Sequence, residues 1–397
     1  MAPSIIRRRL SNLKKPMRIL DPMAGSGTTV VAARLNGHQA VGFDTDPLAL
    51  LIARTWSSSV SPEALRIQAK KVLDSAQKTY RNLTPADAYP QKADDETRAF
   101  IRFWFDQTAR RQLTALSRAI SRVNDSTKRR FLWSAFSRMI ITKQAGASLA
   151  MDVSHSRPHK TYKVAPLRPL ERFLVAVDAV LRASPFSSGK VLPRAVIKKA
   201  DARKLPLNNG SIDLVVTSPP YLNAIDYLRG HKFSLVWMGH SIEEIRHLRS
   251  QSIGTECSVA SARNANRTSF AIRKMGKTDQ LPERSRGMLA RYVNDMNTVM
   301  AEIHRVLTQK GEAVVVVGDS TIKGVFVRNS RALAYLGRAN GLMLRSVRRR
   351  RLLENRRYLP PPESKASGKL LRSRMREEVI LTFGKNLEAD VKPGVYR

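Results

Sequence analysis

The stretch Met17-Arg18-Ile19-Leu20-Asp21-Pro22-Met23-Ala24-Gly25-Ser26-Gly27-Thr28-Thr29 decides the fold of this chain. Its first four residues predict a short β-strand. The glycine-containing turn that follows leads into a helical pattern from Thr28 to Leu35. The pair Asn36-Gly37 ends that helix, because glycine tolerates the left-handed conformation of a helix C-cap. A strand, a glycine turn and a helix in this order are typical of the first unit of an open parallel sheet.

The same alternation continues on both sides of a long interruption. A second strand runs from Ala40 to Phe43 and closes on Asp44, and Pro47 then opens another helix, a favoured first-turn position. Strands return only at Ala195–Ile197 and Ile212–Val216. We therefore predict an α/β fold with a mostly parallel sheet.

The end of the chain predicts the rest of this sheet. Helices are expected from about Ala290 to Leu307 and from Ser330 to Asn340, on either side of a strand at Ala313–Val317. Two late strands follow, around Leu342–Arg349 and Glu378–Phe383, and one of them is expected to be antiparallel.

The interruption, from about Ser61 to Phe186, has a mostly helical pattern, with helices expected at Ala99–Ile120 and Lys128–Ile141. Its exposed positions are rich in arginine: Arg110, Arg111, Arg118, Arg122, Arg129 and Arg130. Such a run is usually a solvated face, and contact with a polyanion is the alternative. The predicted organisation is residues 1–60 as the first half of the sheet domain, 61–190 as a helical insertion, 191–239 as the second half, 240–290 as a long basic loop, and 291–397 as the final helices and strands.

The charge of the chain points to a nucleic-acid partner. Its 397 residues carry a formal net charge of +38, and Lys and Arg contacts with phosphates supply most non-specific affinity for nucleic acid. A generally basic proteome or association with the ribosome is the alternative explanation. No stretch approaches the roughly 18 consecutive apolar residues of a membrane span, and no signal peptide follows the basic N-terminus. With a single cysteine, Cys257, a disulfide framework is excluded, and we expect a cytoplasmic protein without a membrane partner.

The glycine turn has the features of a cofactor site. Glycines let the backbone approach a ligand closely, and the helix that follows presents free amides. A phosphate loop would need a lysine after Gly27, and a dinucleotide site would need a third glycine where Val30 stands. Asp44, at the end of the second strand, is where doubly wound folds bind a ribose hydroxyl. An adenosine ligand with a positive charge, S-adenosylmethionine, fits this combination. The candidate binding residues are Asp21, Pro22, Ala24, Gly25, Gly27, Thr28 and Asp44.

A second turn, Ser218-Pro219-Pro220-Tyr221, lies at the carboxyl end of a predicted strand, where ligands bind in open α/β sheets. Two prolines fix φ twice and remove two amide donors, so the Ser218 hydroxyl and the carbonyls remain as acceptors in a rigid turn. Acceptors around an exocyclic amine favour a nitrogen with an available lone pair, which can attack a sulfonium methyl in line. Tyr221 is expected to stack on a base rotated out of the duplex. These four residues are the candidate catalytic residues.

With both turns in view, the sequence resembles the amino-group DNA methyltransferases, which modify cytosine N4 or adenine N6. The segment Asp21–Thr29 resembles their cofactor motif, with Met23 where phenylalanine is usual, and Ser218–Tyr221 resembles their catalytic motif. The resemblance implies a Rossmann-like class I methyltransferase sheet, S-adenosylmethionine as cofactor and DNA as partner. It also implies that Asp44 binds the ribose and that Asp201 lies near the adenine ring. It extends to Phe103–Phe105 and Ser154–Pro158 of the insertion.

The resemblance favours cytosine N4 as the target, because Ser-Pro-Pro-Tyr is commoner in the N4-cytosine enzymes and Asp-Pro-Pro-Tyr in the N6-adenine enzymes. Adenine N6, an RNA base, and a catalytically impaired DNA-binding relative remain alternatives. The basic residues from Arg246 to Arg286 are the candidate target-recognition region, since arginine can read guanine while other basic residues hold phosphates. A restriction endonuclease of the same system is a candidate partner, and the sequence leaves the oligomeric state open.

Four further expectations concern features outside these motifs. Family members usually carry a segment before the cofactor strand that helps hold the methionine end. Only about sixteen residues precede Met17, none of which resembles it, so we expect that segment to be missing or supplied elsewhere. C5-cytosine methylation needs a cysteine nucleophile and is excluded, because Cys257 lies outside any Pro-Cys dipeptide. His155 and His159 are not expected to bind a metal, because Pro158 opposes a helix that would present both, and Asp226-Tyr227 is a candidate for approaching the base.

Overall fold

The computed structural model describes residues 3–11, 13, 15–140, 146–150, 160–186, 192–222, 227–254, 265–352 and 377–385. These residues form two compact units. The sheet unit consists of Met1–Thr45, Leu192–Ala224 and Ser250–Arg397, and the helical unit consists of Asp46–Val191 and Ile225–Arg249. The boundary expected at residue 60 differs, because the helix that Pro47 opens packs with the helices of the insertion.

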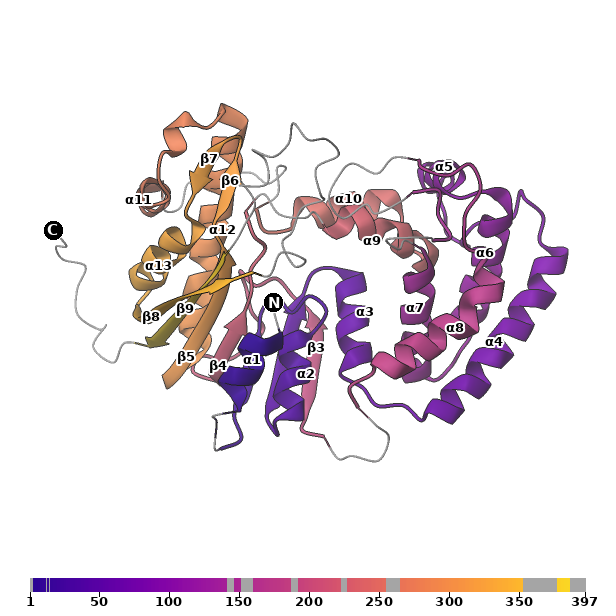
Figure 1. The fold of residues 1–397 in the computed structure, drawn as a ribbon, viewed down its shortest axis with the longest axis horizontal. Coiled ribbons are helices and arrows are strands. Elements are labelled where there is room, and N and C mark those ends of the chain that lie inside the picture. The colour runs from indigo at the N-terminus through magenta and orange to yellow at the C-terminus, as the bar shows by residue number, and fades with distance from the viewer. Residues whose placement is uncertain are drawn as a thin grey trace. The chain divides into compact units, whose positions relative to one another are not determined.

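The sheet unit is built on seven strands in the order β3-β2-β1-β4-β5-β9-β8 (Figure 1). Pairing is parallel from β3 to β5 and antiparallel where β9 pairs with β5 and β8. This is a Rossmann-like α/β fold, and the predicted sheet with an antiparallel late strand is confirmed. The strands are β1 (Arg18–Asp21), β2 (Gln39–Asp44), β3 (Ala195–Lys199), β4 (Ile212–Thr217), β5 (Leu307–Gly318), β8 (Leu342–Arg351) and β9 (Glu377–Lys385). A separate antiparallel hairpin joins β6 (Ser320–Ile322) and β7 (Val325–Val327).

Helices cover both faces of this sheet, and β2 shows how the sequence divides the two faces. Successive side chains of a strand point to opposite faces. Val41 and Phe43 belong to the core that also holds residues of the long helix Glu283–Val306. On the opposite face Gly42 lies against Val30 of the helix that follows β1. The helices of this unit are α1 (Pro3–Leu10), α2 (Thr28–Leu35), α11 (Ala265–Lys274), η2 (Thr278–Gln280), α12 (Glu283–Val306) and α13 (Asn329–Ala339).

The helical unit packs around its own apolar core, which holds Trp104, Phe105, Phe136, Phe233 and Trp237. Ring contacts between Phe105 and both Phe233 and Trp237, with centroids 6.3 and 5.1 Å apart, join the insertion to the returning segment 227–249. Its helices are α3 (Pro47–Trp56), α4 (Pro62–Asn82), α5 (Asp95–Trp104), α6 (Gln107–Ser121), α7 (Ser126–Ile140), α8 (Pro169–Ala183), α9 (Tyr227–Leu235), η1 (Val236–Met238) and α10 (Ile242–Ser250).

Arginines of the insertion hold its own backbone together. Arg111 donates to the carbonyl oxygens of Leu83 and Tyr80 at 2.8 and 3.0 Å, which satisfies carbonyls at the C-terminal end of α4. Arg118 donates to the carbonyl of Asp87 at 3.0 Å, and Arg129 to that of Val123 at 2.7 Å. Four of the six arginines singled out from the sequence therefore bind carbonyls within the unit, since Arg110 also donates to the carbonyl of Pro85.

Two sequence expectations about local structure are wrong. The single helix expected at Ala99–Ile120 is two helices, because Phe105 is extended and Asp106 caps the second one by accepting from the amide of Ala109 at 2.8 Å. The stretch 240–290 is not a long loop in its described part, since α10 and α11 lie in it. Both helices bury only a narrow apolar stripe, so their polar composition hid the pattern.

No helix in the described part of the chain is long and apolar enough to cross a membrane.

Candidate active site

The glycine turn lies at the carboxyl end of β1 and is fastened to β2. The amide of Ala24 donates to the carbonyl of Phe43, and the amide of Gly25 donates to Oδ2 of Asp44, both at 2.8 Å. Gly25 and Gly27 have φ values of +52° and +83°, a left-handed conformation that glycine adopts without steric cost. A Cβ built on Gly25 would meet no atom within 4 Å, so the space above the turn is open to a ligand.

Asp21 lies beneath this turn and joins it to the next strand. Its Oδ2 accepts from the Thr29 hydroxyl and its Oδ1 from the Thr217 hydroxyl, both at 2.7 Å. The amide of Met23 adds a third hydrogen bond at 3.2 Å. Burial raises the pKa of Asp21, and the three hydrogen bonds oppose that shift. Because the side chain is 4% exposed, its geometry suits holding the two turns together more than touching a ligand.

The remaining predicted cofactor residues surround this anchor. Pro22, Ala24 and Gly27 are buried, and Thr28, partly buried, begins α2.

Gly42 was missed by sequence reasoning. Its absent side chain makes room for Val30, the residue that stands where a dinucleotide motif has its third glycine, because a Cβ would lie 2.8 Å from Val30 Cγ2. A glycine facing the helix from the neighbouring strand therefore permits the close packing.

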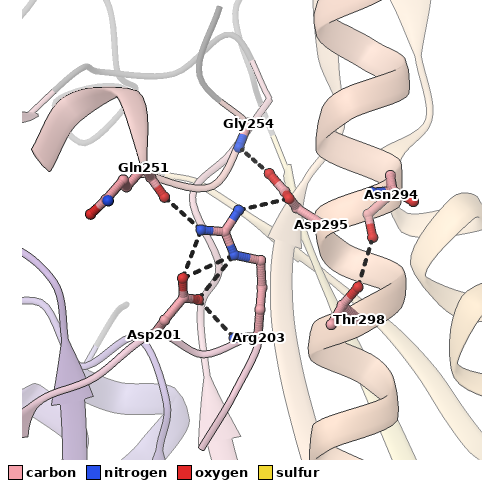
Figure 2. A network of polar contacts seen from close by, with 7 residues as sticks. All are labelled: Asp201, Arg203, Gln251, Gly254, Asn294, Asp295 and Thr298. Atoms are coloured by element: carbon pink, nitrogen blue, oxygen red, sulfur yellow. Dashed lines mark hydrogen bonds and ion pairs between the residues drawn. The ribbon is translucent and has the colours of Figure 1, made fainter. Parts of the chain in front are cut away.

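Asp201 follows β3, which pairs with β2, and the amide of Ala200 donates to the carbonyl of Asp44 at 3.2 Å. Figure 2 shows Arg203 between two carboxylates, those of Asp201 and Asp295. Arg203 lies 2.6 Å from Asp201 and 2.8 Å from Asp295 of α12, and also donates to the carbonyl of Gln251 at 2.7 Å. The hydrogen bonds to Asp201 and Asp295, together with the charges of these carboxylates, raise the pKa of Arg203 above its ordinary value. The guanidinium thus fixes the Asp201 carboxylate.

The network of Arg203 extends to the segment before residue 255. Asp295 accepts a second hydrogen bond, from the amide of Gly254 at 3.0 Å. The backbone amide, Nε and Nη2 of Arg203 together make four hydrogen bonds to the two oxygens of Asp201, which orient that carboxylate. Sequence reasoning missed Arg203 and Asp295. The spacing Asp201-x-Arg203 was the available signal, but the partner on α12 lies too far along the chain to be recognised from the sequence.

The second turn lies at the carboxyl end of β4, directly beside β1. Ile19 and Leu20 pair with Leu214 and Val215 in parallel register. Pro219 is buried, Pro220 is exposed, and Ser218 and Tyr221 are partly buried.

The two side chains of this turn that carry hydroxyls form a chain of hydrogen bonds. The Ser218 hydroxyl donates to the Tyr221 hydroxyl at 3.3 Å, and the latter donates to Oε1 of Glu378 on β9 at 3.0 Å. Glu378 is a fourth residue that sequence reasoning missed, after Gly42, Arg203 and Asp295. The structure therefore brings Asp21, Asp44, Asp201 and Ser218 to one edge of the sheet, where the carboxyl ends of β1, β2, β3 and β4 lie.

Other candidates lie in the helical unit or outside the described residues. Tyr227 begins α9 in the helical unit, and Asp226 lies outside the described residues. Ser154–Pro158, His159 and Cys257 also lie outside them. The resemblance to the methyltransferase family extended to the aromatic residues Phe103–Phe105 of the insertion. Trp104 and Phe105 belong to the core of the helical unit, whereas Phe103 is 52% exposed.

Comparison with known proteins gives two similar curated sequences. The chain is 23% identical over 275 residues to the Type II methyltransferase M.BsoBI of Geobacillus stearothermophilus, covering 62% of this chain and 52% of that protein. It is 22% identical over 344 residues to the Type II methyltransferase M.MvaI of Kocuria varians, covering 78% and 72% respectively. No family model matches. The chain thus spans about half the length of the first relative, and these similarities confirm the resemblance to DNA methyltransferases that the two motifs indicated.

The solved structures to which the chain is similar include a TehB-like SAM-dependent methyltransferase from Corynebacterium glutamicum. It is 10% identical with a TM-score of 0.30, covering 96% of this chain and 88% of that one. A SAM-dependent methyltransferase from Methanosarcina mazei is 9% identical with a TM-score of 0.35, covering 97% and 98%.

Proposed function

We propose that this relative of the Type II methyltransferases transfers a methyl group from S-adenosylmethionine to the exocyclic amine of a DNA base, with cytosine N4 as the favoured target. The observation that supports this most is the hydrogen bond between Asp21 and Thr217. It ties the glycine turn to the residue before Ser218, and so couples the candidate cofactor site to the candidate catalytic turn. A transfer reaction needs its two reactants in one fixed geometry.

The residues present fit the cofactor. The open space above Gly25 admits a ligand close to the backbone. Asp44 is the candidate acceptor for the ribose hydroxyls, and Asp201, held by Arg203, is the candidate acceptor for the adenine amine. When bound, S-adenosylmethionine supplies an electrophilic methyl group on a cationic sulfur. The chain itself supplies orientation and acceptor groups.

Ser218 is proposed to act on the target amine. Its oxygen, with a carbonyl of the rigid Pro219-Pro220 turn, accepts the two N–H bonds of the amine and leaves the nitrogen lone pair free for in-line attack. The nitrogen–methyl bond forms as the sulfur–methyl bond breaks, and the methylated amine then loses one proton to solvent water. Tyr221 provides a ring on which a base rotated out of the duplex stacks, a contact worth about 1–3 kcal/mol.

A basic surface on α11 is the proposed DNA contact. Residues 265–286 carry six basic and two acidic side chains. Arg267, Phe270, Arg273 and Lys274 are exposed, whereas Ala271 is buried against the core. Arg273 and Lys274 lie 5.1 and 4.8 Å from the ring centroid of Phe270. An exposed aromatic ring between cations suits both phosphates and bases. The arginines of α6 are less suited, because the carbonyls of their own unit occupy them.

Methyl transfer from tritiated S-adenosylmethionine tests the proposal, with DNA and RNA offered separately and the modified nucleoside identified by mass spectrometry. We expect N4-methylcytosine in DNA, abolished by Ser218→Ala, which directly follows β4, and retained by the control Ser211→Ala, which directly precedes the same strand. N6-methyladenine would move the target to the alternative base, and transfer to RNA alone would overturn the substrate class. Cofactor binding without any transfer would indicate a catalytically impaired DNA-binding relative. A restriction endonuclease of the same system is the proposed partner. It should cut unmodified DNA and leave DNA that this protein has modified uncut.

A further inference from the structure

Glu378 is a buried carboxylate that the catalytic proposal has not used. Its residue is 3% exposed, and it lies at the start of β9, directly opposite Arg350 on β8 in the antiparallel register. Its two oxygens face different partners. Oε1 accepts from the Tyr221 hydroxyl at 3.0 Å, and Oε2 lies 2.7 Å from the Arg350 guanidinium.

A buried carboxylate is costly unless it is paired, and removal of one partner leaves an uncompensated charge. Arg350 supplies the opposite charge and is itself held by Ser4, whose hydroxyl accepts at 3.0 Å. The fold therefore holds an ionised acceptor beside the catalytic turn, on a strand that reaches this position only through the late antiparallel pairing.

The direction of the hydrogen bonds follows from the chemistry of the groups. An ionised carboxylate only accepts, so the Tyr221 hydroxyl must donate its proton to Glu378. The Tyr221 oxygen in turn accepts a hydrogen bond from the Ser218 hydroxyl, 3.3 Å away. With its own proton committed, the Ser218 oxygen can offer only lone pairs to another molecule.

We propose that Glu378 is a positioning residue that acts through Tyr221 to keep Ser218 an acceptor. This inference rests on the proposed function, because an acceptor is what a target amine requires. The same hydrogen bond holds the Tyr221 ring at its hydroxyl end, so the plane on which a base would stack is set by β9. Glu378 itself touches neither cofactor nor substrate.

A double-mutant cycle tests this relationship in the full chain. Glu378→Met removes the acceptor at similar size, Tyr221→Phe removes the hydroxyl and keeps the ring, and the third variant combines both. We expect each single variant to lower kcat about tenfold, the effect of one lost hydrogen bond. The kcat of the double variant should lie within about twofold of the kcat of Tyr221→Phe, because the two residues act in series. The Kd for S-adenosylmethionine should stay within about twofold of wild type.

A conservative variant separates this role from general stability. Glu378→Gln keeps an oxygen for Tyr221 but loses the charge that pairs with Arg350, so it should retain most of kcat while its melting temperature falls. Glu377→Gln, at the exposed neighbouring position, is the matched control and should leave kcat unchanged. Additive losses in the cycle, or equal kcat losses for Glu378→Gln and Glu378→Met, would overturn the inference alone. Wild-type protein that transfers no methyl group at all would overturn the proposed function together with it.

Discussion

The backbone amide of Gly25 donates to the carboxylate of Asp44 across 2.8 Å, although nineteen residues separate them in the chain. The bond holds the first glycine of the turn in its left-handed conformation and fixes the carboxylate proposed to bind the ribose. One side chain thus shapes the turn and presents an acceptor above it.

Replacement of this side chain should therefore weaken cofactor binding. We expect Asp44→Ala to raise the Kd for S-adenosylmethionine by about 10- to 100-fold. The variant loses both the proposed hydrogen bond to the ribose and the hydrogen bond from the amide of Gly25. Isothermal titration calorimetry measures this. Asp213→Asn is the matched control, because Asp213 also accepts a backbone amide, that of Arg18 at 2.8 Å, but at the opposite end of the strands. Equal affinities for the Asp44 variant and wild type would contradict the ribose assignment.

Gly42→Ala should destabilise the sheet unit by overpacking. The new methyl group would lie 2.8 Å from Val30 Cγ2 and 3.2 Å from Ala24 Cβ, so α2 and the turn must shift. We expect a loss of about 1–3 kcal/mol in the free energy of unfolding, measured by urea denaturation. Gly287→Ala is the control, because its methyl group would meet only the flexible end of Arg291 at 3.5 Å, and alanine favours a helix. A neutral Gly42→Ala would show that the helix and strand are not in close contact.

The buried carboxylate of Asp21 should make stability depend on pH. Because burial raises its pKa, the folded protein keeps a proton that the unfolded chain loses above about pH 4. The free energy of unfolding contributed by Asp21 therefore falls as the pH rises from there through the folded-state pKa. Asp21→Asn removes this loss, so its stability relative to wild type should grow with pH over that window. Urea denaturation between pH 4 and 8 measures the difference. A difference that is constant or shrinks with pH would contradict the shift.

Basic residues of the two units should respond differently to substitution. Arg273→Ala combined with Lys274→Ala should leave the melting temperature nearly unchanged. It should reduce the slope of log K for DNA against log salt by about 1 to 2, one for each lost phosphate contact. Arg111→Met should do the reverse, lowering stability by about 1–2 kcal/mol through its lost carbonyl contacts while leaving the slope intact. Fluorescence anisotropy over a salt series measures the slopes. An unchanged slope for the α11 variant would remove that helix from the DNA surface.

Local signals in the sequence predicted the glycine turn and its helix well. The helix expected at Thr28–Leu35 has those bounds in the structure, because glycine on one side and Asn36-Gly37 on the other are short-range stop signals. The break at Phe105 escaped prediction for the opposite reason. The apolar pattern runs through it because α5 and α6 pack against one core, and Asp106 is fixed by distant partners, accepting from the amide of Ala165 at 2.6 Å.

The candidate site shows the same difference between residues defined by their neighbours in the chain and residues placed by distant contacts. Gly25, Gly27 and Ser218 could be identified from motifs, since their neighbours in the chain define the turns. Glu378 could not, because it meets Tyr221 from 157 residues away and its own neighbours form an ordinary strand. Side chains that orient a site come from elements that the tertiary fold brings together, and a single sequence holds no local trace of that pairing.

The central strand pair has a consequence for how the protein is made. The amide of Arg18 on β1 binds Asp213 on β4 across 195 residues of chain. β2 follows β1 closely, but at a synthesis rate of roughly 5–20 residues per second β1 waits about 10 to 40 s on the ribosome before its other neighbour, β4, is translated. During that time the edge of β1 that pairs with β4 has no partner in the sheet, while most of the helical unit has already been synthesised. The nascent chain is therefore most exposed to aggregation before β4 emerges, and a translational pause within the insertion would prolong that exposure.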